Sequence, residues 1–186
     1  MRSTFLAAVA MLALTMPAWA AAPQPALSSD TVKVFRSIQN QVLDYEHYTV
    51  FDTVSAAISD DGVVTLTGKV TMPYKRDDIE RRVSGVKGVR QVHNRIDVLP
   101  ASKSDDEMRV AIARAIYNNQ AFRSYAARVH PPIHVIVERG RVTLEGVVND
   151  HSDRLLALSL AGSHGSFTIV DRLMTVEEAR DEIAGL

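Results

Sequence analysis

The sequence predicts an α+β protein built from two tandem, small α-β-β-α-β domains, each a three-stranded mixed sheet with two helices on one face. The first observation is a repeat: DGVVTLTGKV at residues 61–70 recurs as RGRVTLEGVV at residues 139–148. In both copies a glycine turn leads into apolar residues at alternate positions, the pattern of a half-buried strand. Apolar residues at helical spacing lie before and after this unit, so both copies predict the same order of elements.

The N-terminus predicts a cleavable secretory signal peptide and therefore an exported protein. Arg2 precedes an apolar segment from Phe5 to Met16, and Ala18-Trp19-Ala20 fits the small-x-small cleavage rule. The apolar segment is short for a membrane span, and without Cys the chain has no site for a lipid anchor. A mature chain that begins near Ala21, without a transmembrane segment, is expected; a retained N-terminal anchor is the alternative.

Composition and motifs argue against several functions. Removal of residues 1–20 leaves 20 basic and 22 acidic side chains, a balance unlike the basic surface of a nucleic-acid-binding protein. The sequence contains no His-Glu-x-x-His pair, nucleophile elbow, phosphate-binding glycine loop or dinucleotide fingerprint, so neither catalysis nor a cofactor is expected. His130 and His134 have a spacing that suits a metal on a helix, but Pro131 and Pro132 exclude a helix there.

The first copy predicts a helix and a hairpin. Apolar residues recur at helical spacing from Val32 to Val42, which indicates a helix that ends near residues 45–47. The segments Val50–Ile58 and Val63–Val70 alternate as strands and pair through the turn at Gly62. A second helix then begins at Pro73 and a third strand follows it. Together the elements divide the chain into signal peptide 1–20, flexible leader 21–29, domain 1 at 30–99, linker 100–104, domain 2 at 105–176 and polar tail 177–186.

The second copy predicts the same order with local differences. A capping-box pattern, Ser104–Glu107, is expected to begin its first helix. The strand before Gly140 lacks one residue relative to the first copy. The last strand is matched to the first copy at an offset of 78 (140 − 62), which aligns Met174 with Ile96. The remaining predicted elements are a strand with Ile133, Val135 and Val137 alternating, a strand at Val142–Val148, a helix from Asp150 to about Gly162 and a strand at Phe167–Val176.

Four glycines have predicted structural roles. Gly62 and Gly140 occupy turn positions where a positive φ is expected, which glycine adopts without steric cost. Gly68 and Gly146 fall inside the following strands, where a missing side chain indicates a bulge or a close approach of another backbone segment.

The repeat resembles a known family. DGVVTLTGKV, a helix, and then GVKGVRQVHNRIDV are similar to the BON domain, a small bacterial envelope module of OsmY-type and nodulation-associated proteins. The second copy resembles it less well, because Ser163–Phe167 departs from the turn seen at Gly85–Val89. The resemblance implies two α/β domains without known catalytic residues that bind phospholipid or other envelope components in the periplasm.

Basic residues of the first copy are one candidate binding surface. The segment Lys75–Arg95 contains seven basic and three acidic residues. Such a charge is attracted to anionic lipid headgroups. The alternative is a solvated helix in which Asp77 pairs with Arg81 and Asp78 with Arg82. The candidate lipid-binding residues are Lys75, Arg76, Arg81, Arg82, Lys87 and Arg90.

Leucines of the second copy are the other candidate surface. At an offset of 78, the expected core residues Ile79 and Val83 align with Ala157 and Ala161. Charged residues of the first copy align instead with Leu155, Leu156, Leu158 and Leu160. Four leucines at those angles cannot all face one small core, so either the helix rotates or it presents an apolar patch. The expected partner of such a patch is domain 1, with a membrane surface or a client protein as the alternatives.

These features predict a non-enzymatic envelope protein that binds anionic membrane lipid through its BON-like domains and supports envelope integrity. The alternative is a chaperone-like or protein-interaction module that acts on an envelope protein under envelope or osmotic stress. Binding to lipid predicts sensitivity to salt, whereas binding of a client through the leucines predicts little effect of salt.

Overall fold

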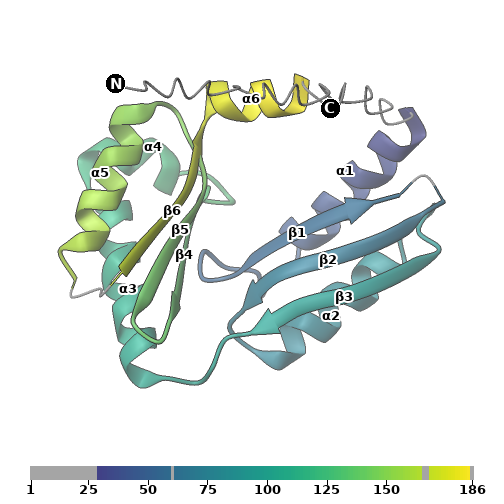
Figure 1. Cartoon of the computed structure of the whole chain (residues 1–186), viewed down its shortest axis with the longest axis horizontal. Helices are drawn as coiled ribbons and strands as arrows, with labels where there is room; N and C mark the ends of the chain where they lie inside the picture. The colour runs from purple at the N-terminus through teal and green to yellow at the C-terminus, as the bar shows by residue number, and fades with distance from the viewer. Residues whose placement is uncertain (1–28, 60, 165–167, 185–186) are drawn as a thin grey trace, which may run out of the picture.

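The computed structural model describes residues 29–59, 61–164 and 168–184, so the predicted signal peptide and nearly all of the leader lie outside it. The element order confirms two tandem α-β-β-α-β units (Figure 1). The elements are α1 Ser29–Leu43, β1 Thr53–Ile58, β2 Val63–Val70, α2 Pro73–Ser84, β3 Gln91–Val98, α3 Lys103–Tyr117, η1 Gln120–Phe122, α4 Arg123–Ala126, β4 Ile133–Glu138, β5 Arg141–Val148, α5 His151–Gly162, β6 Thr168–Thr175 and α6 Val176–Ala184.

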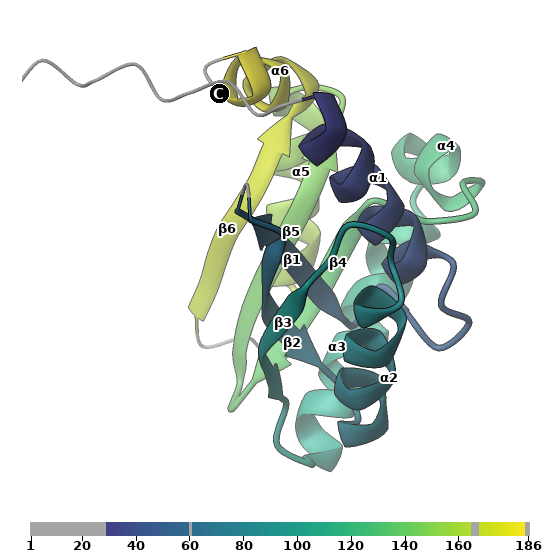
Figure 2. The same cartoon turned by 90° about the vertical axis from the view of Figure 1, so that its right-hand side faces the viewer.

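Each domain contains one mixed sheet with helices on one face. In the orders β1-β2-β3 and β4-β5-β6, the first pair of strands is antiparallel and the second pair is parallel. Helices α1 and α2 cover the first sheet (Figure 2), and α3 and α5 cover the second. Alternate residues of each strand therefore face either a helix-covered core or an open sheet face. The predicted fold class is confirmed.

The hairpin of domain 1 has one residue more before its turn glycine than that of domain 2, counted from Val54 opposite Gly68 and from Ile133 opposite Gly146. In domain 1 the turn ends at Gly62, whose φ is 80°. In domain 2 Glu138 pairs directly with Arg141, so Arg139 and Gly140 form a two-residue turn with φ values of 52° and 75°. Two positive φ angles are the mark of a type I′ turn, which matches the twist of the flanking strands. The sequence indicated that domain 2 lacks one residue before Gly140. The structure shows that this residue is missing from the loop, which is shorter than the loop of domain 1.

The strand glycines are sites of close backbone approach, as predicted. A Cβ on Gly68 would lie 2.1 Å from the carbonyl oxygen of Thr53, and one on Gly146 would lie 1.8 Å from that of Pro132. Their φ angles of 128° and 135° are also unfavourable for any L side chain. Both positions therefore require glycine, and Gly68 and Gly146 pair with equivalent residues of the third strand, Ile96 and Leu173.

That pairing corrects the predicted alignment of the last strand. Gly68 lies opposite Ile96, and Gly146 lies opposite Leu173, so Leu173 rather than Met174 is the equivalent of Ile96. Leu173 is 1% exposed, as expected for that core position. The connection between α5 and β6 is thus one residue shorter than its counterpart in domain 1, and the offset of 78 does not extend into β6.

Domain 2 also departs from the prediction at its helices. The cap of α3 is Ser102, whose side chain accepts a hydrogen bond from the Asp105 N–H at 3.2 Å, so the capping box predicted at Ser104 is wrong. The short helices η1 and α4 were not predicted, and they bury Phe122 and Tyr125 in the domain 2 core. The tail predicted as polar at residues 177–186 lies mostly in α6, which packs against β5 and β6.

Candidate functional site

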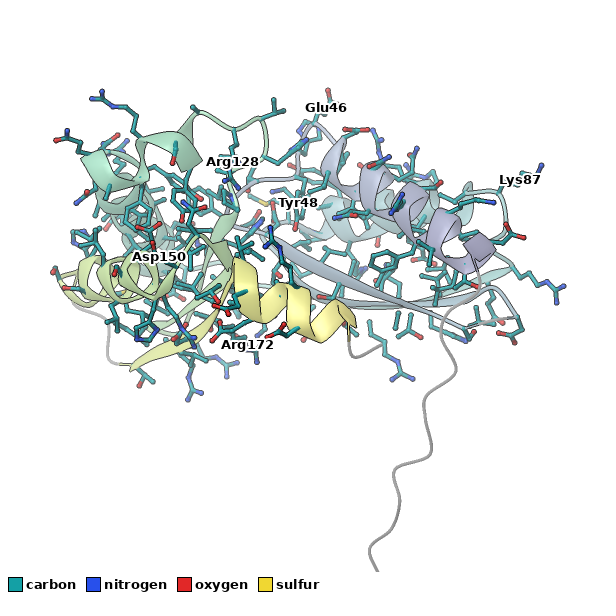
Figure 3. All side chains as sticks on the ribbon, turned by 90° about the horizontal axis from the view of Figure 1, so that it is seen from above. Glu46, Tyr48, Lys87, Arg128, Asp150 and Arg172 are labelled. Carbon is teal, nitrogen blue, oxygen red and sulfur yellow. The ribbon has the colours of Figure 1, made fainter. Side chains whose placement is uncertain are left out.

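A basic pocket lies between α1 and the C-terminal end of α2. Its volume is about 540 Å³, and it brings together three of the predicted lipid-binding residues, Arg81, Arg82 and Lys87. Figure 3 shows Lys87 at the end of domain 1 that lies farthest from domain 2. Helix α1 contributes two polar side chains that suit an anionic ligand, Ser37 and Gln41. We call this site the α1–α2 pocket.

Neighbouring side chains hold two of the pocket's arginines in place. The Asp78 carboxylate accepts a hydrogen bond from Arg81 at 2.7 Å and another from the Tyr45 hydroxyl at 2.7 Å. The hydrogen bonds from Tyr45 and Arg81 keep the pKa of Asp78 below its ordinary value. The guanidinium of Arg82 lies 4.9 Å from the centre of the Tyr45 ring, which is cation–π geometry. The predicted pairing of Asp78 with Arg82 is therefore wrong.

The other predicted basic residues lie elsewhere. Lys75 is 5% exposed and donates to Asp52 at 2.7 Å, so it is a core residue and cannot reach a lipid. Arg76 pairs with Asp77 at 2.9 Å, which also replaces the predicted pairing of Asp77 with Arg81. Arg90 is exposed beside the Gly62 turn and does not line the α1–α2 pocket. A buried ammonium group is stable only with a counter-ion, which Asp52 provides. Lys75 is therefore committed to this pair and is not available to a lipid headgroup.

The leucines of α5 do not dock on domain 1. Ala157 and Ala161 occupy the predicted core positions, both 0% exposed. Leu156, Leu158 and Leu160 pack partly buried around the core of domain 2, and only Leu155, at 55% exposure, projects from it. Figure 1 shows α5 on the side of the second sheet that faces away from domain 1. Because the two alanines are small, the flanking leucines can cover the core beside them. The predicted contact of these leucines with domain 1 is wrong.

A second hollow, which the sequence did not reveal, lies between the open faces of the two sheets. This inter-domain cleft has a volume of about 750 Å³, and charged side chains of both domains line it. The signal in the sequence was a pair of arginines around the Gly140 turn. No pattern in the neighbouring sequence indicated that these arginines lie in one hollow with Arg95 and Asp97 of β3. The charged residues of the cleft are Lys69, Arg95, Asp97, Glu138, Arg139, Arg141, Glu145 and Arg172.

The domains contact one another beside this cleft. Lys69 forms an ion pair with Glu138, and the Thr53 hydroxyl donates to Glu145 at 2.7 Å. The Val135 N–H, on the edge strand β4, donates to the carbonyl oxygen of Val50 at 2.7 Å. Phe51, next to it, packs against the core of domain 2. The loop before β1 therefore pairs with the free edge of the second sheet at Val135, between Ile133 and Val137, which Tyr117 and Arg109 of domain 2 bond.

His134 completes this contact and gives it a predicted dependence on pH. Its Nδ1 lies 2.6 Å from the Asp52 carbonyl oxygen, which fixes a proton on that nitrogen, and its ring lies 5.7 Å from that of Tyr48. Burial lowers the pKa of His134 from its ordinary value of 6.5, although Asp52 and Glu145 partly oppose the shift. The unfolded chain therefore binds this proton more readily than the folded chain, and stability falls as the pH drops below the ordinary value.

We expect the His134 ring, followed by NMR, to titrate below the ordinary histidine value of 6.5. We also expect the free energy of unfolding to decrease between pH 7 and pH 5, and this decrease to become smaller in His134→Gln. A midpoint for His134 above 6.5 would contradict this assignment.

A family profile of the BON domain matches residues 51–100 and again residues 104–178. The chain belongs to the BON domain family. Each match covers one of the two sheets, so the protein contains two tandem BON domains, and the resemblance seen in the sequence is confirmed. BON domains are associated with the bacterial envelope and with phospholipid, and the family is generally non-catalytic.

Two solved structures of a type III secretion protein show a weak similarity to this BON protein. A C-terminal domain of CdsD from Chlamydia trachomatis is 14% identical, with a TM-score of 0.31, over 83% of this chain and 70% of that one. A second CdsD structure is 12% identical, with a TM-score of 0.30, over 82% of this chain and 97% of that one. No curated protein sequence matches. Among the described helices, none is long and apolar enough to cross a membrane.

Proposed function

We propose that this protein binds anionic phospholipid headgroups at a membrane surface in the periplasm, without catalysis, and thereby supports envelope integrity. The observation that carries the proposal is the convergence of Arg81, Arg82 and Lys87 on the α1–α2 pocket. Guanidinium and ammonium groups donate charge-assisted hydrogen bonds to phosphate oxygens, which are stronger than hydrogen bonds between neutral groups. Membership of the BON family supports the same function.

Electrostatics sets the expected strength of this binding. Each Lys or Arg close to an anionic bilayer contributes about 1 kcal/mol, and salt screens the attraction. The Arg81 and Lys87 side chains are exposed and can reach a headgroup without unfolding. Arg82 is held against Tyr45 and is better suited to orient the headgroup than to attract it from a distance.

We expect Arg81→Gln/Lys87→Gln to float poorly with vesicles that contain anionic lipid. Loss of two charges at about 1 kcal/mol each corresponds to roughly thirtyfold weaker partitioning at low salt. The control is Arg114→Gln/Arg123→Gln, which removes two exposed charges from domain 2 and should float like the unmodified protein. Equal loss in both variants, or no flotation of the unmodified protein, would overturn the proposal.

The protein-interaction alternative has less surface available than the sequence indicated. Three of the four leucines on α5 pack around the core of domain 2, which leaves Leu155 as the exposed one. Salt-resistant binding that is lost in Leu155→Asp would favour this alternative over lipid.

A further inference from the structure

The inter-domain cleft contains positive charge that the domain contact does not neutralise. Lys69 pairs with Glu138, and Arg172 lies 3.8 Å from Glu145. Five basic and three acidic residues line the cleft, so its walls have a net charge of +2. Figure 3 shows Arg172 on the side of domain 2 that faces domain 1. The remaining three basic residues, within the described part of the chain, have no ion-pair partner: Arg95, Arg139 and Arg141.

The backbone at Arg139 is held in a conformation that its residue type disfavours. Its φ of 52° is the only positive φ of a non-glycine residue among those described. The first position of such a turn favours Asn, Asp or Gly, and strained backbone of this kind clusters at functional sites. The buried carboxylate of Asp105 accepts hydrogen bonds from the Arg139 N–H at 2.8 Å and the Gly140 N–H at 3.0 Å. These hydrogen bonds fix the turn, so Arg139 and Arg141, on either side of Gly140, remain at the cleft.

The rest of the lining suits a hydrated, charged ligand. Both open sheet faces present hydroxyls to the cleft, including those of Ser55, Thr67 and Thr143. No aromatic side chain is among its lining residues in the described part of the chain, so nothing there would stack on a base or sugar ring. Arginine binds phosphate through two parallel hydrogen bonds, and a dianionic phosphate group balances a net charge of +2.

We propose that the inter-domain cleft is a second anion site, which binds the phosphate group of a ligand that bridges both domains. Arg95 of β3 provides the domain 1 side, and Arg139 and Arg141 of the β4–β5 turn provide the domain 2 side. This site is separate from the α1–α2 pocket and does not depend on the function proposed for that pocket. The phosphate can belong to a lipid headgroup or to a soluble compound, since both present the same oxygens.

The test is calorimetric titration of the full chain with inorganic pyrophosphate. Arg95→Gln and Arg141→Gln are expected to bind at least tenfold more weakly, while Arg114→Gln/Arg123→Gln, which removes two exposed charges of domain 2 outside the cleft, binds like the unmodified protein. Failure of the unmodified protein to bind pyrophosphate, or equal losses in the cleft variants and in this control, would overturn the proposal. Competition by vesicles that contain phosphatidic acid would support a lipid source, and its absence would support a soluble one.

The variant Arg139→Asn distinguishes an effect on pyrophosphate binding from an effect on the stability of the fold. Asparagine adopts a positive φ more readily than arginine, so this variant is expected to melt at a higher temperature than the unmodified protein. It should also bind pyrophosphate more weakly, because the cleft loses one cation. A variant that gains stability and keeps its full affinity would remove Arg139 from the proposed site.

Discussion

Replacement of Asp52 by alanine is expected to lower the free energy of unfolding by about 3–5 kcal/mol, because it leaves Lys75 buried without a counter-ion. Asp52 is 0% exposed. Its carboxylate accepts hydrogen bonds from the N–H and hydroxyl of Thr49, from the N–H and hydroxyl of Thr71, and from Lys75 Nζ at 2.7 Å. The substitution therefore leaves the loop before β1, the end of β2 and the start of α2 without their common acceptor.

Urea denaturation at neutral pH measures this loss. The matched control is Asp61→Ala, since the exposed Asp61 carboxylate accepts a side-chain hydrogen bond from Ser59 and pairs with no buried cation. This control should change the free energy of unfolding by less than about 1 kcal/mol. Lys75→Met should be destabilising as well, and the double variant Asp52→Ala/Lys75→Met should lose less than the sum of the two single losses. A loss below 1 kcal/mol for Asp52→Ala would show that the pair contributes nothing to stability.

The substitution Gly146→Ala is expected to destabilise domain 2 by about 3 kcal/mol or more, from backbone strain and steric overlap together. The added Cβ would lie 1.8 Å from the Pro132 carbonyl oxygen, and a backbone atom cannot rotate away as a flexible side chain can. The φ of 135° adds strain that no rearrangement of neighbours removes. Relief would require β4 and β5 to separate at Ile133, which pairs with Gly146 in the ladder.

Thermal unfolding of Gly146→Ala should be compared with Gly162→Ala. At the end of α5, a Cβ on Gly162 would meet only the tip of Ile169 at 3.4 Å, and no positive φ is required. This control should be neutral or slightly stabilising, because alanine is favoured over glycine in helices. Unfolding temperatures that are equal for the two variants would contradict the inferred clash at Gly146.

Local patterns in the sequence were sufficient to predict the sheets. The Gly62 and Gly140 turns, the alternating strands and the core residues Ile79 and Val83 depend on neighbours in the chain, so their positions could be predicted. Lys75 could have been found too, since it lies four residues before Ile79 on the same face of α2. Its charge suggested exposure, because its counter-ion Asp52 lies in the segment predicted as the strand Val50–Ile58, whereas β1 begins only at Thr53 and Asp52 lies in the loop before it.

The parts that could not be predicted depend on tertiary arrangement. The inter-domain cleft exists because the open faces of two sheets meet, and no local pattern specifies the angle between domains. The segment that forms η1 and α4 is too short for helical periodicity, although Phe122 and Tyr125 are buried there. The convergence of Arg81, Arg82 and Lys87 on one pocket likewise depends on how α1 packs against α2.

The contact of Val50 and Phe51 with domain 2 has a consequence for evolution by duplication. A copied domain brings with it a new unpaired strand edge, and bare edges promote assembly of sheets into polymers. Here the first copy pairs with that edge at Val135, whereas Tyr117 and Arg109 of the second copy itself bond Ile133 and Val137 on the same edge. Excision of the second copy at the linker would therefore free the Val135 N–H at the middle of β4 and leave that point open to another strand.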